Sequence, residues 1–137
     1  MKQKELLPNS GKATHSSINL YQRRIGSITY AATITRLDIA FATSRLSRFN
    51  QNPSDEHLEA AEHLIRYLLG TKTYALQLGG EDTLDTWSDA SFGDNTIDRR
   101  SSQAYMIKLF GGVIGWRANK QDIITTSITE AELLFLA

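Results

Sequence analysis

The chain has 137 residues, of which 41% are hydrophobic and 22% are charged, values that fit one globular domain or two small units sharing a core. No apolar run approaches the roughly 20 residues that a membrane-spanning helix needs, and the N-terminus lacks the apolar stretch of a secretory signal. Because there is no cysteine, disulfides and thiolate metal sites are excluded. We therefore expect a cytoplasmic or nuclear protein with no membrane partner.

The net charge is zero, but the two signs are distributed unevenly along the chain. Residues 1–72 contain ten Lys and Arg against six Asp and Glu, whereas residues 73–137 contain five against nine. This asymmetry predicts a basic surface beside an acidic one. The basic half suits phosphate groups, although a solvated face explains the same modest excess.

The first half of the chain is predicted to be helical after a polar N-terminal segment. Breakers such as Pro8 and Gly11 indicate that residues 1–18 are a tail or linker. A first helix is expected after an Asn19 N-cap, a second over residues 37–50, and a third between a Ser54 N-cap and Gly70. Their apolar stripes, at helical spacing, are Tyr21, Ile25, Ile28 and Ala32; Ile39, Ala42, Leu46 and Phe49; and Leu58, Ala61, Ile65 and Leu68.

Three polar side chains of these helices have specific expected positions. Arg45 and Arg48 lie off the second stripe, and we expect them to point toward solvent. His57, in the first turn of the third helix, is expected to cap or pack that helix. It is six residues from His63, and this spacing does not match the i, i+4 pairs that bind zinc on one helix face.

From Tyr74 onward the apolar pattern changes from helical to strand-like. Strands are predicted over residues 74–78, 84–88, 102–110 and 113–117, with Gly111-Gly112 as a hairpin turn. A further helix is expected to begin near Thr129 and to be cut short at the end of the sequence. The sequence therefore predicts an α+β fold, a three-helix unit followed by a mainly antiparallel sheet and a truncated C-terminal helix.

One carboxylate stands out because of its position at the end of a predicted strand. Asp89 follows the strand over residues 84–88, where the backbone is held while the carboxylate faces solvent. A divalent ion needs such fixed oxygen ligands. The alternative is an ordinary solvated turn, and the same alternative applies to the neighbouring acids Asp85, Asp94 and Asp98.

Short motifs follow one another between residues 19 and 137. In the helical part they are Tyr21-x4-Gly26-Ser27-x2-Tyr30-x-Ala32, Thr35-Arg36-Leu37-Asp38-Ile39-Ala40, Leu46-Ser47-Arg48-Phe49, Asn52-Pro53-x3-His57 and Arg66-Tyr67-Leu68-x-Gly70-Thr71. In the strand part they are Ser88-Asp89-Ala90, Asp98-Arg99-x-Ser101-x3-Tyr105, Gly111-Gly112-x-Ile114-x-Trp116 and Thr129-Glu130-Ala131-Glu132. In this order they resemble the C-terminal part of copia-type LTR-retrotransposon Pol polyproteins, where the end of the reverse transcriptase leads into ribonuclease H.

The resemblance implies two functional parts. Residues 19–73 are similar to the thumb and connection of the reverse transcriptase, whose helices grip a primer–template duplex. Residues 74–137 are similar to the N-terminal portion of a ribonuclease H-like domain, which cleaves the RNA of an RNA–DNA hybrid. The resemblance implies sequence-independent phosphate contacts from basic side chains, although a solubilising role is the alternative for each; the candidates are Arg23, Arg24, Arg45, Arg48 and Lys72.

The resemblance also implies two Mg²⁺ ions in the complete enzyme. Asp89 is expected to be the bridging metal ligand and Glu132 the second, in preference to Glu130, and both would be catalytic. The family's third and fourth metal-binding acids are missing from this sequence, so we expect Mg²⁺ binding to be weak or absent. The parent family is an RNA-directed DNA polymerase and hybrid ribonuclease, and this chain alone is expected to be inactive. The alternatives are a domesticated, non-catalytic nucleic-acid-binding module and a non-functional transposon remnant.

Overall fold

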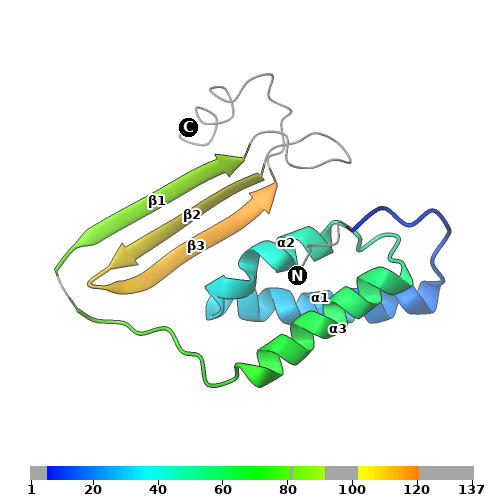
Figure 1. Cartoon of the computed structure of the whole chain (residues 1–137), viewed down its shortest axis with the longest axis horizontal. Helices are drawn as coiled ribbons and strands as arrows, with labels where there is room; N and C mark the ends of the chain where they lie inside the picture. Colours follow the sequence, from blue (N-terminus) through cyan, green and yellow to red (C-terminus); the bar gives the residue numbers. More distant parts are fainter. Residues whose placement is uncertain (1–5, 81, 92–101, 121–137) are drawn as a thin grey trace.

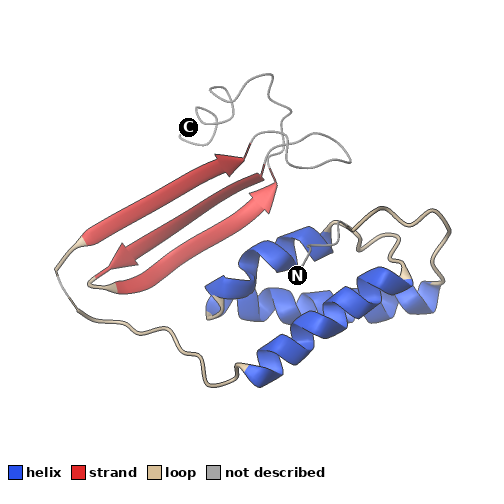
Figure 2. Ribbon diagram, in the orientation of Figure 1, coloured by secondary structure: helices blue, strands red, loops and turns tan. Residues whose placement is uncertain are grey.

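The protein is α+β, as predicted, with three helices followed by a three-stranded antiparallel sheet (Figures 1 and 2). The computed structural model describes residues 6–80, 82–91 and 102–120. In the described part of the chain, no helix combines the length and apolar character needed to cross a membrane. The expected helix after Thr129 lies outside the described residues.

Helix α1 (His15–Ile34) begins at His15 and not after Asn19 as the sequence suggested. The cap is Thr14, whose side chain accepts a hydrogen bond from the Ser17 N–H at 3.2 Å. The predicted stripe is correct, because its four members are the buried residues of this helix; they are Tyr21, Ile25, Ile28 and Ala32.

The described part of the expected tail is held against the rest of the molecule. The Asn9 side chain donates to the Pro53 carbonyl at 2.9 Å. The Asn52 side chain accepts from the Ala13 N–H at 2.8 Å and donates to the Gly11 carbonyl at 2.9 Å. Two asparagines thus join the N-terminal segment to the loop between the second and third helices, a contact that local composition did not indicate.

The second predicted helix is shorter than expected. A 3₁₀ turn η1 (Leu37–Ile39) leads into helix α2 (Ala40–Ser47), and turns follow as far as Asn52. Helix α3 (Asp55–Gly70) begins after Ser54 as predicted, but its C-cap residue is Thr71 and not Gly70.

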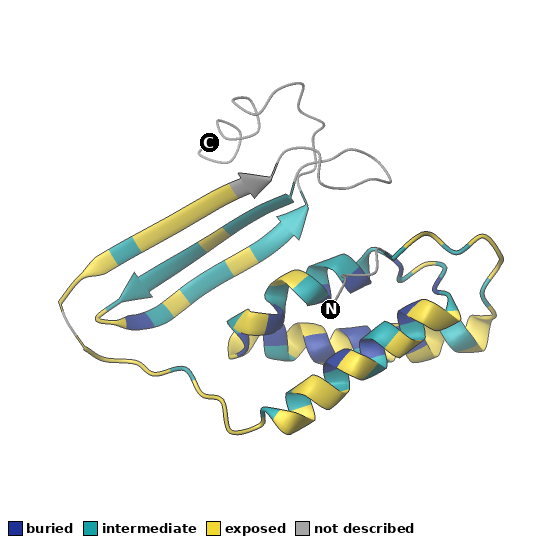
Figure 3. Cartoon of the chain, viewed as in Figure 1, coloured by how far each residue is buried: buried dark blue, intermediate teal, exposed yellow. Residues whose placement is uncertain are grey.

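The buried core of the described residues lies in the three helices, in η1 and in the turn that follows α2 (Figure 3). Tyr21 is fully buried and its hydroxyl donates to the Leu46 carbonyl at 2.8 Å, which joins α1 to α2. On α3 the core residues are Ala61 and Leu64, whereas the expected Leu58, Ile65 and Leu68 are only partly buried.

The sheet consists of β1 (Leu84–Ser91), β2 (Ser102–Leu109) and β3 (Gly112–Lys120), in that order. The predicted hairpin is present, but its central residues are Phe110 and Gly111, one position earlier than expected. Both have positive φ, 49° and 75°, as the tight turns of β-hairpins require.

The predicted strand over residues 74–78 is wrong, since this segment has no strand structure. It passes against the start of β3, where a Cβ on Gly112 would lie only 2.6 Å from the Gln77 carbonyl oxygen. Only glycine allows this approach. The segment therefore supports the hairpin and does not pair with β1.

The sheet contributes little to the core. Of its residues whose burial is described, Gly112 alone is buried, and several large apolar side chains are exposed; they are Leu84, Trp87, Tyr105 and Ile114. The stability of the sheet therefore depends on its contact with the helices.

Candidate nucleic-acid interface

The helices and the sheet meet where α2 lies beside β3 (Figure 1). The indole Nε1–H of Trp116 donates to the Ala32 carbonyl at 2.7 Å. A guanidinium N–H of Arg48 donates to the Ser102 hydroxyl at 3.3 Å. Because Trp116 and Ser102 both contact the helices, they identify the sheet face that is turned toward α1 and α2.

Asp89 shares this face of the sheet. In the strand register Asp89 is opposite Ala104, which is two residues along β2 from Ser102. Residues two apart on a strand point to the same side. The carboxylate is exposed to solvent and lines a hollow of about 180 Å³ between α2 and the sheet, together with Phe41, Ser44, Arg48, Ser102, Gln103, Ala104 and Asn119.

A second, larger hollow lies on the other side of Arg48. Its volume is about 270 Å³ and it is lined by the N-terminal segment, the turn that follows α2 and the end of β3, with Pro8, Asn9, Arg48, Phe49, Gln51, Asn52 and Lys120 contributing. Of the described residues, Arg48 is the one that borders both hollows.

The remaining predicted acids do not complete a metal site in the described structure. Glu132, Glu130, Asp94 and Asp98 lie outside the described residues. Asp85 is opposite Lys108 on β2 and does not line the hollow that contains Asp89. Among the residues that the structure describes, no group of three His, Cys, Asp or Glu side chains could hold a metal ion.

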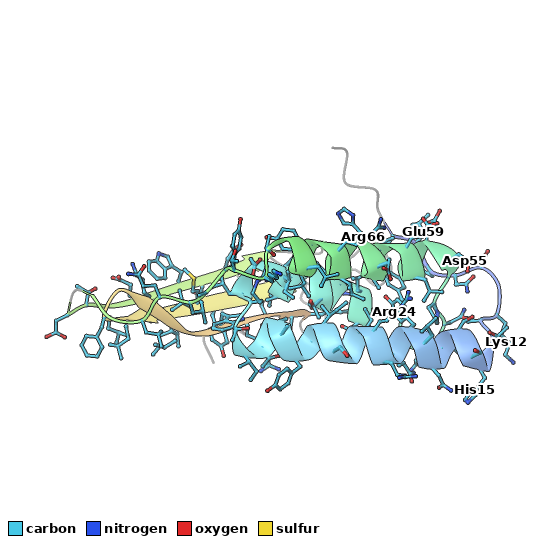
Figure 4. All side chains as sticks on the ribbon, turned by 90° about the horizontal axis from the view of Figure 1, so that it is seen from below. Lys12, His15, Arg24, Asp55, Glu59 and Arg66 are labelled. Carbon is cyan, nitrogen blue, oxygen red and sulfur yellow. The ribbon has the colours of Figure 1, made fainter. Side chains whose placement is uncertain are left out.

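The five predicted phosphate-binding residues do not form one cluster. Arg23 and Lys72 are exposed. Arg24, labelled in Figure 4, forms an ion pair of 3.3 Å with Glu62 that joins α1 to α3. Arg45 and Arg48 were expected to point toward solvent, but both are half-buried.

The burial of Arg45 and Arg48 has a simple cause. The Arg45 guanidinium lies 5.8 Å from the centre of the Phe41 ring, and Arg48 extends toward Ser102 on the sheet. Helical periodicity places both side chains off the apolar stripe, but it shows neither the contact of Arg45 with Phe41 nor the sheet that Arg48 reaches. Of the five candidates, Arg48 is the one that reaches the two hollows between the helical part and the sheet, which we call the junction hollows.

Arg36 is a polar centre that the candidate list missed. It is only 8% exposed, and its guanidinium donates to both carboxylate oxygens of Asp38, at 2.9 and 2.8 Å. It also donates to the carbonyl and the hydroxyl of Thr71, at 3.2 and 2.6 Å. The hydrogen bonds that Asp38 accepts from Arg36, together with one from the Tyr67 hydroxyl, hold the pKa of the Asp38 carboxyl below its usual range.

A signal for this contact was present in the sequence. Arg36 and Asp38 belong to one motif and Thr71 to another, and both motifs flank predicted helix ends. A charged pair at the start of one helix and a hydroxyl at the end of another can satisfy unpaired groups at those ends. The role of Arg36 is structural, because it fixes the end of α3.

The expectation for His57 is confirmed. Its Nδ1 accepts the Ser54 backbone N–H at 2.8 Å, which caps α3. The ring stacks on Phe49 with centroids 3.8 Å apart. Burial lowers the pKa of His57, although the Leu7 backbone and the Glu56 charge act in the opposite direction.

These features define an α+β unit in which a helical part with several arginines packs on a sheet, and the sheet presents the Asp89 carboxylate at the same junction. Relatives with the same sequence pattern are found among transposon proteins. The chain is 40% identical over 115 residues to the retrovirus-related Pol polyprotein from transposon TNT 1-94 of Nicotiana tabacum, an alignment that covers 83% of this chain and 9% of that protein. It is 38% identical over 114 residues to the Pol polyprotein from transposon RE1 of Arabidopsis thaliana, which covers 82% of this chain and 8% of that protein.

A relative of similar length is also present. The secreted RxLR effector protein 161 of Plasmopara viticola is 37% identical over 119 residues, which covers 85% of this chain and 84% of that protein. No protein-family model matches the chain. No solved structure matches it either. The chain belongs to the copia-type retrotransposon Pol family, and it spans less than a tenth of the length of the two Pol polyproteins named above.

Proposed function

We propose that this chain is a nucleic-acid-binding segment of a copia-type Pol polyprotein whose parental roles are reverse transcription and degradation of the RNA in RNA–DNA hybrids. Residues 19–73 would correspond to the thumb and connection, and residues 74–137 to the N-terminal part of the ribonuclease H-like domain. The partner is an RNA–DNA hybrid or a primer–template duplex, and a cytoplasmic or nuclear location goes with that role.

The observation that carries the proposal is the meeting of Asp89 and Arg48 at one junction. The two residues come from motifs that are far apart in the sequence, yet both line the same hollow between α2 and the sheet. A cation beside an exposed acid suits a sugar–phosphate strand, because the cation attracts phosphate and the carboxylate accepts hydrogen bonds from hydroxyl or amino groups.

The described residues do not by themselves fit a pair of magnesium ions. Mg²⁺ needs several hard oxygen ligands in octahedral geometry, and two ions need shared carboxylates. Asp89 is the one carboxylate that lines its hollow in the described structure, and Glu132 is outside the described residues. We therefore propose that the 137-residue chain binds nucleic acid but does not cleave it.

The test is a titration of the purified chain with a fluorescent RNA–DNA hybrid at several salt concentrations. Binding should weaken steeply as salt increases, because phosphate contacts release counterions. The same hybrid incubated with the chain and Mg²⁺ should stay intact. Absence of binding at low salt would contradict the proposed function, and rapid cleavage of the RNA strand would contradict the proposed lack of catalysis.

A second candidate function is a stand-alone, non-catalytic module. The supporting observation is the Plasmopara viticola relative, which is matched over most of its own length and is named as a secreted effector. The Arg-x-Leu-Arg motif in the name of that relative does not occur in this sequence. A module that acts alone should bind hybrid and duplex DNA with the same affinity when separated from any Pol context, whereas a Pol segment should prefer the hybrid.

A further inference from the structure

We propose that Lys120 and Arg48 together bind one phosphate group of a nucleic-acid strand at the larger junction hollow, so that the adjoining nucleoside faces Asp89. This inference rests on the proposed nucleic-acid function and specifies where on the chain a backbone phosphate binds. Lys120 was not among the basic residues that the sequence motifs indicated.

Lys120 and Arg48 both lie beside the same residue of β2, Ser102. Lys120 is directly opposite Ser102 in the β2–β3 register, and Arg48 donates to the Ser102 hydroxyl from α2. Ser102 therefore lies next to both basic residues, one on the neighbouring strand and one at the C-cap of α2. Two positive charges at one hollow attract a phosphate more strongly than either of the separate arginines on α1.

The composition of the larger hollow also suits an anion. Among the residues that the structure describes, the lining of this hollow includes two basic and three amide side chains and no acidic one. Two of those amides have structural partners: Asn9 donates to Pro53, and Asn52 is bonded to Ala13 and Gly11. The walls are thus held in place before a ligand arrives, which lowers the entropy cost of binding.

The smaller hollow offers a different chemistry to the rest of the nucleotide. It contains the Asp89 carboxylate, hydroxyl and amide groups, and the ring of Phe41. A carboxylate repels phosphate but accepts hydrogen bonds from sugar hydroxyls and base amino groups. The strand spacings place the Cα atoms of Lys120 and Asp89 about 12 Å apart, so a short stretch of nucleic acid can contact both hollows.

The test compares hybrid binding by Lys120→Gln with that of the unchanged chain over a series of salt concentrations. Loss of one phosphate contact should weaken binding roughly three- to tenfold at low salt and lower the slope of log affinity against log salt by about one. Lys120→Arg keeps the charge and should retain the unchanged affinity and slope. Circular dichroism confirms that each variant is folded.

The matched control is Arg66→Gln, which removes one positive charge from the outer surface of α3, away from the junction (Figure 4). It should change affinity and slope much less than Lys120→Gln. If the two variants have equal effects while the unchanged chain binds the hybrid, the proposed phosphate site is refuted, but the proposed nucleic-acid-binding function is not.

A direct readout separates a backbone phosphate from a free one. In NMR titrations, the hybrid should shift the amide signals of Lys120 and Gln51, whereas inorganic phosphate at the same concentration should shift them far less. If inorganic phosphate shifts these signals and the hybrid does not, the hollow binds a free anion, and the proposal that it binds a nucleic-acid backbone is wrong. No shift with either ligand would overturn the inference completely.

Discussion

His57 shows how one side chain can serve both a helix end and the core. It is fully buried, stacks on Phe49 and accepts the Ser54 N–H through Nδ1. Nδ1 can accept this bond only when it carries no proton. The helix cap is therefore linked to pH.

The folded-state pKa of His57 lies below its ordinary value of 6.5 because burial disfavours the charged ring. Its contribution to stability is therefore fully present above pH 6.5 and is lost as pH falls through the lower folded-state pKa. We expect the free energy of unfolding, measured by urea denaturation, to drop between pH 7 and pH 5 by an amount of the order of one hydrogen bond, about 1 kcal/mol.

His57→Gln keeps a side-chain acceptor for the Ser54 N–H but has no titrating ring. The free energy of unfolding of this variant should therefore depend less on pH. The exposed His63 provides the control, because His63→Gln should leave the pH dependence unchanged. An equally steep loss of stability in the His57→Gln variant would show that other groups are responsible.

Individual elements are joined by polar contacts at their ends as well as by the apolar core. The Arg36 guanidinium, at the start of η1, binds Asp38 beside it and Thr71 at the end of α3. The Tyr67 hydroxyl donates to the same Asp38 carboxylate at 2.9 Å, and the rings of Tyr67 and Tyr74 lie 5.6 and 5.5 Å from the guanidinium carbon. This network fixes the point at which the chain leaves α3 for the sheet.

Arg36→Lys keeps the positive charge but cannot form the bidentate hydrogen bond that the guanidinium makes to the Asp38 carboxylate. We expect a loss of about 2 kcal/mol in the free energy of unfolding, since charge-assisted hydrogen bonds of the buried Arg36 guanidinium are broken. The pKa of Asp38, followed by NMR, should move up toward its ordinary range.

Arg66→Lys on the exposed face of α3 is the matched control and should have little effect on stability. If Arg36→Lys were as stable as the unchanged chain, the network would be a consequence of the helix packing and not one of its causes.

On the scale of the whole molecule, stability is divided unequally between the helices and the sheet. The core residues belong to the helices and the turn that follows α2, whereas the described strands expose large apolar side chains. The Trp116–Ala32 hydrogen bond is a specific contact that holds the sheet on the helices. We infer that the sheet opens more easily than the helical unit.

Native-state hydrogen exchange tests this division. Amides in the interior of α1 should exchange at least about tenfold more slowly than those of the β1–β2 ladder. Trp116→Phe removes the indole donor, so it should speed exchange in the sheet while leaving α1 nearly unchanged. Trp87→Phe, at an exposed position on β1, is the control, and uniform protection across both parts would contradict the inference.

Local sequence pattern predicted a substantial part of the fold. The stripe of α1, the start of α3 at Ser54 and the hairpin between β2 and β3 were each correct. These features depend on residues close together in the chain, through helical spacing, a capping side chain and a glycine-containing turn. The start of α1 and the end of α3 were misplaced because Thr14 and Thr71 occupy the cap positions.

The sequence by itself determined the α+β class, the helical stripe of α1 and the family to which the chain belongs, because these depend on periodicity and on motif order. Tertiary structure alone decided that Arg48 is half-buried, that the N-terminal segment is anchored by Asn52, and that Lys120 and Arg48 line one hollow. The physical reason is that these contacts join segments about 40 or more residues apart, and no local spacing specifies which surfaces of a helix and a sheet will pack together.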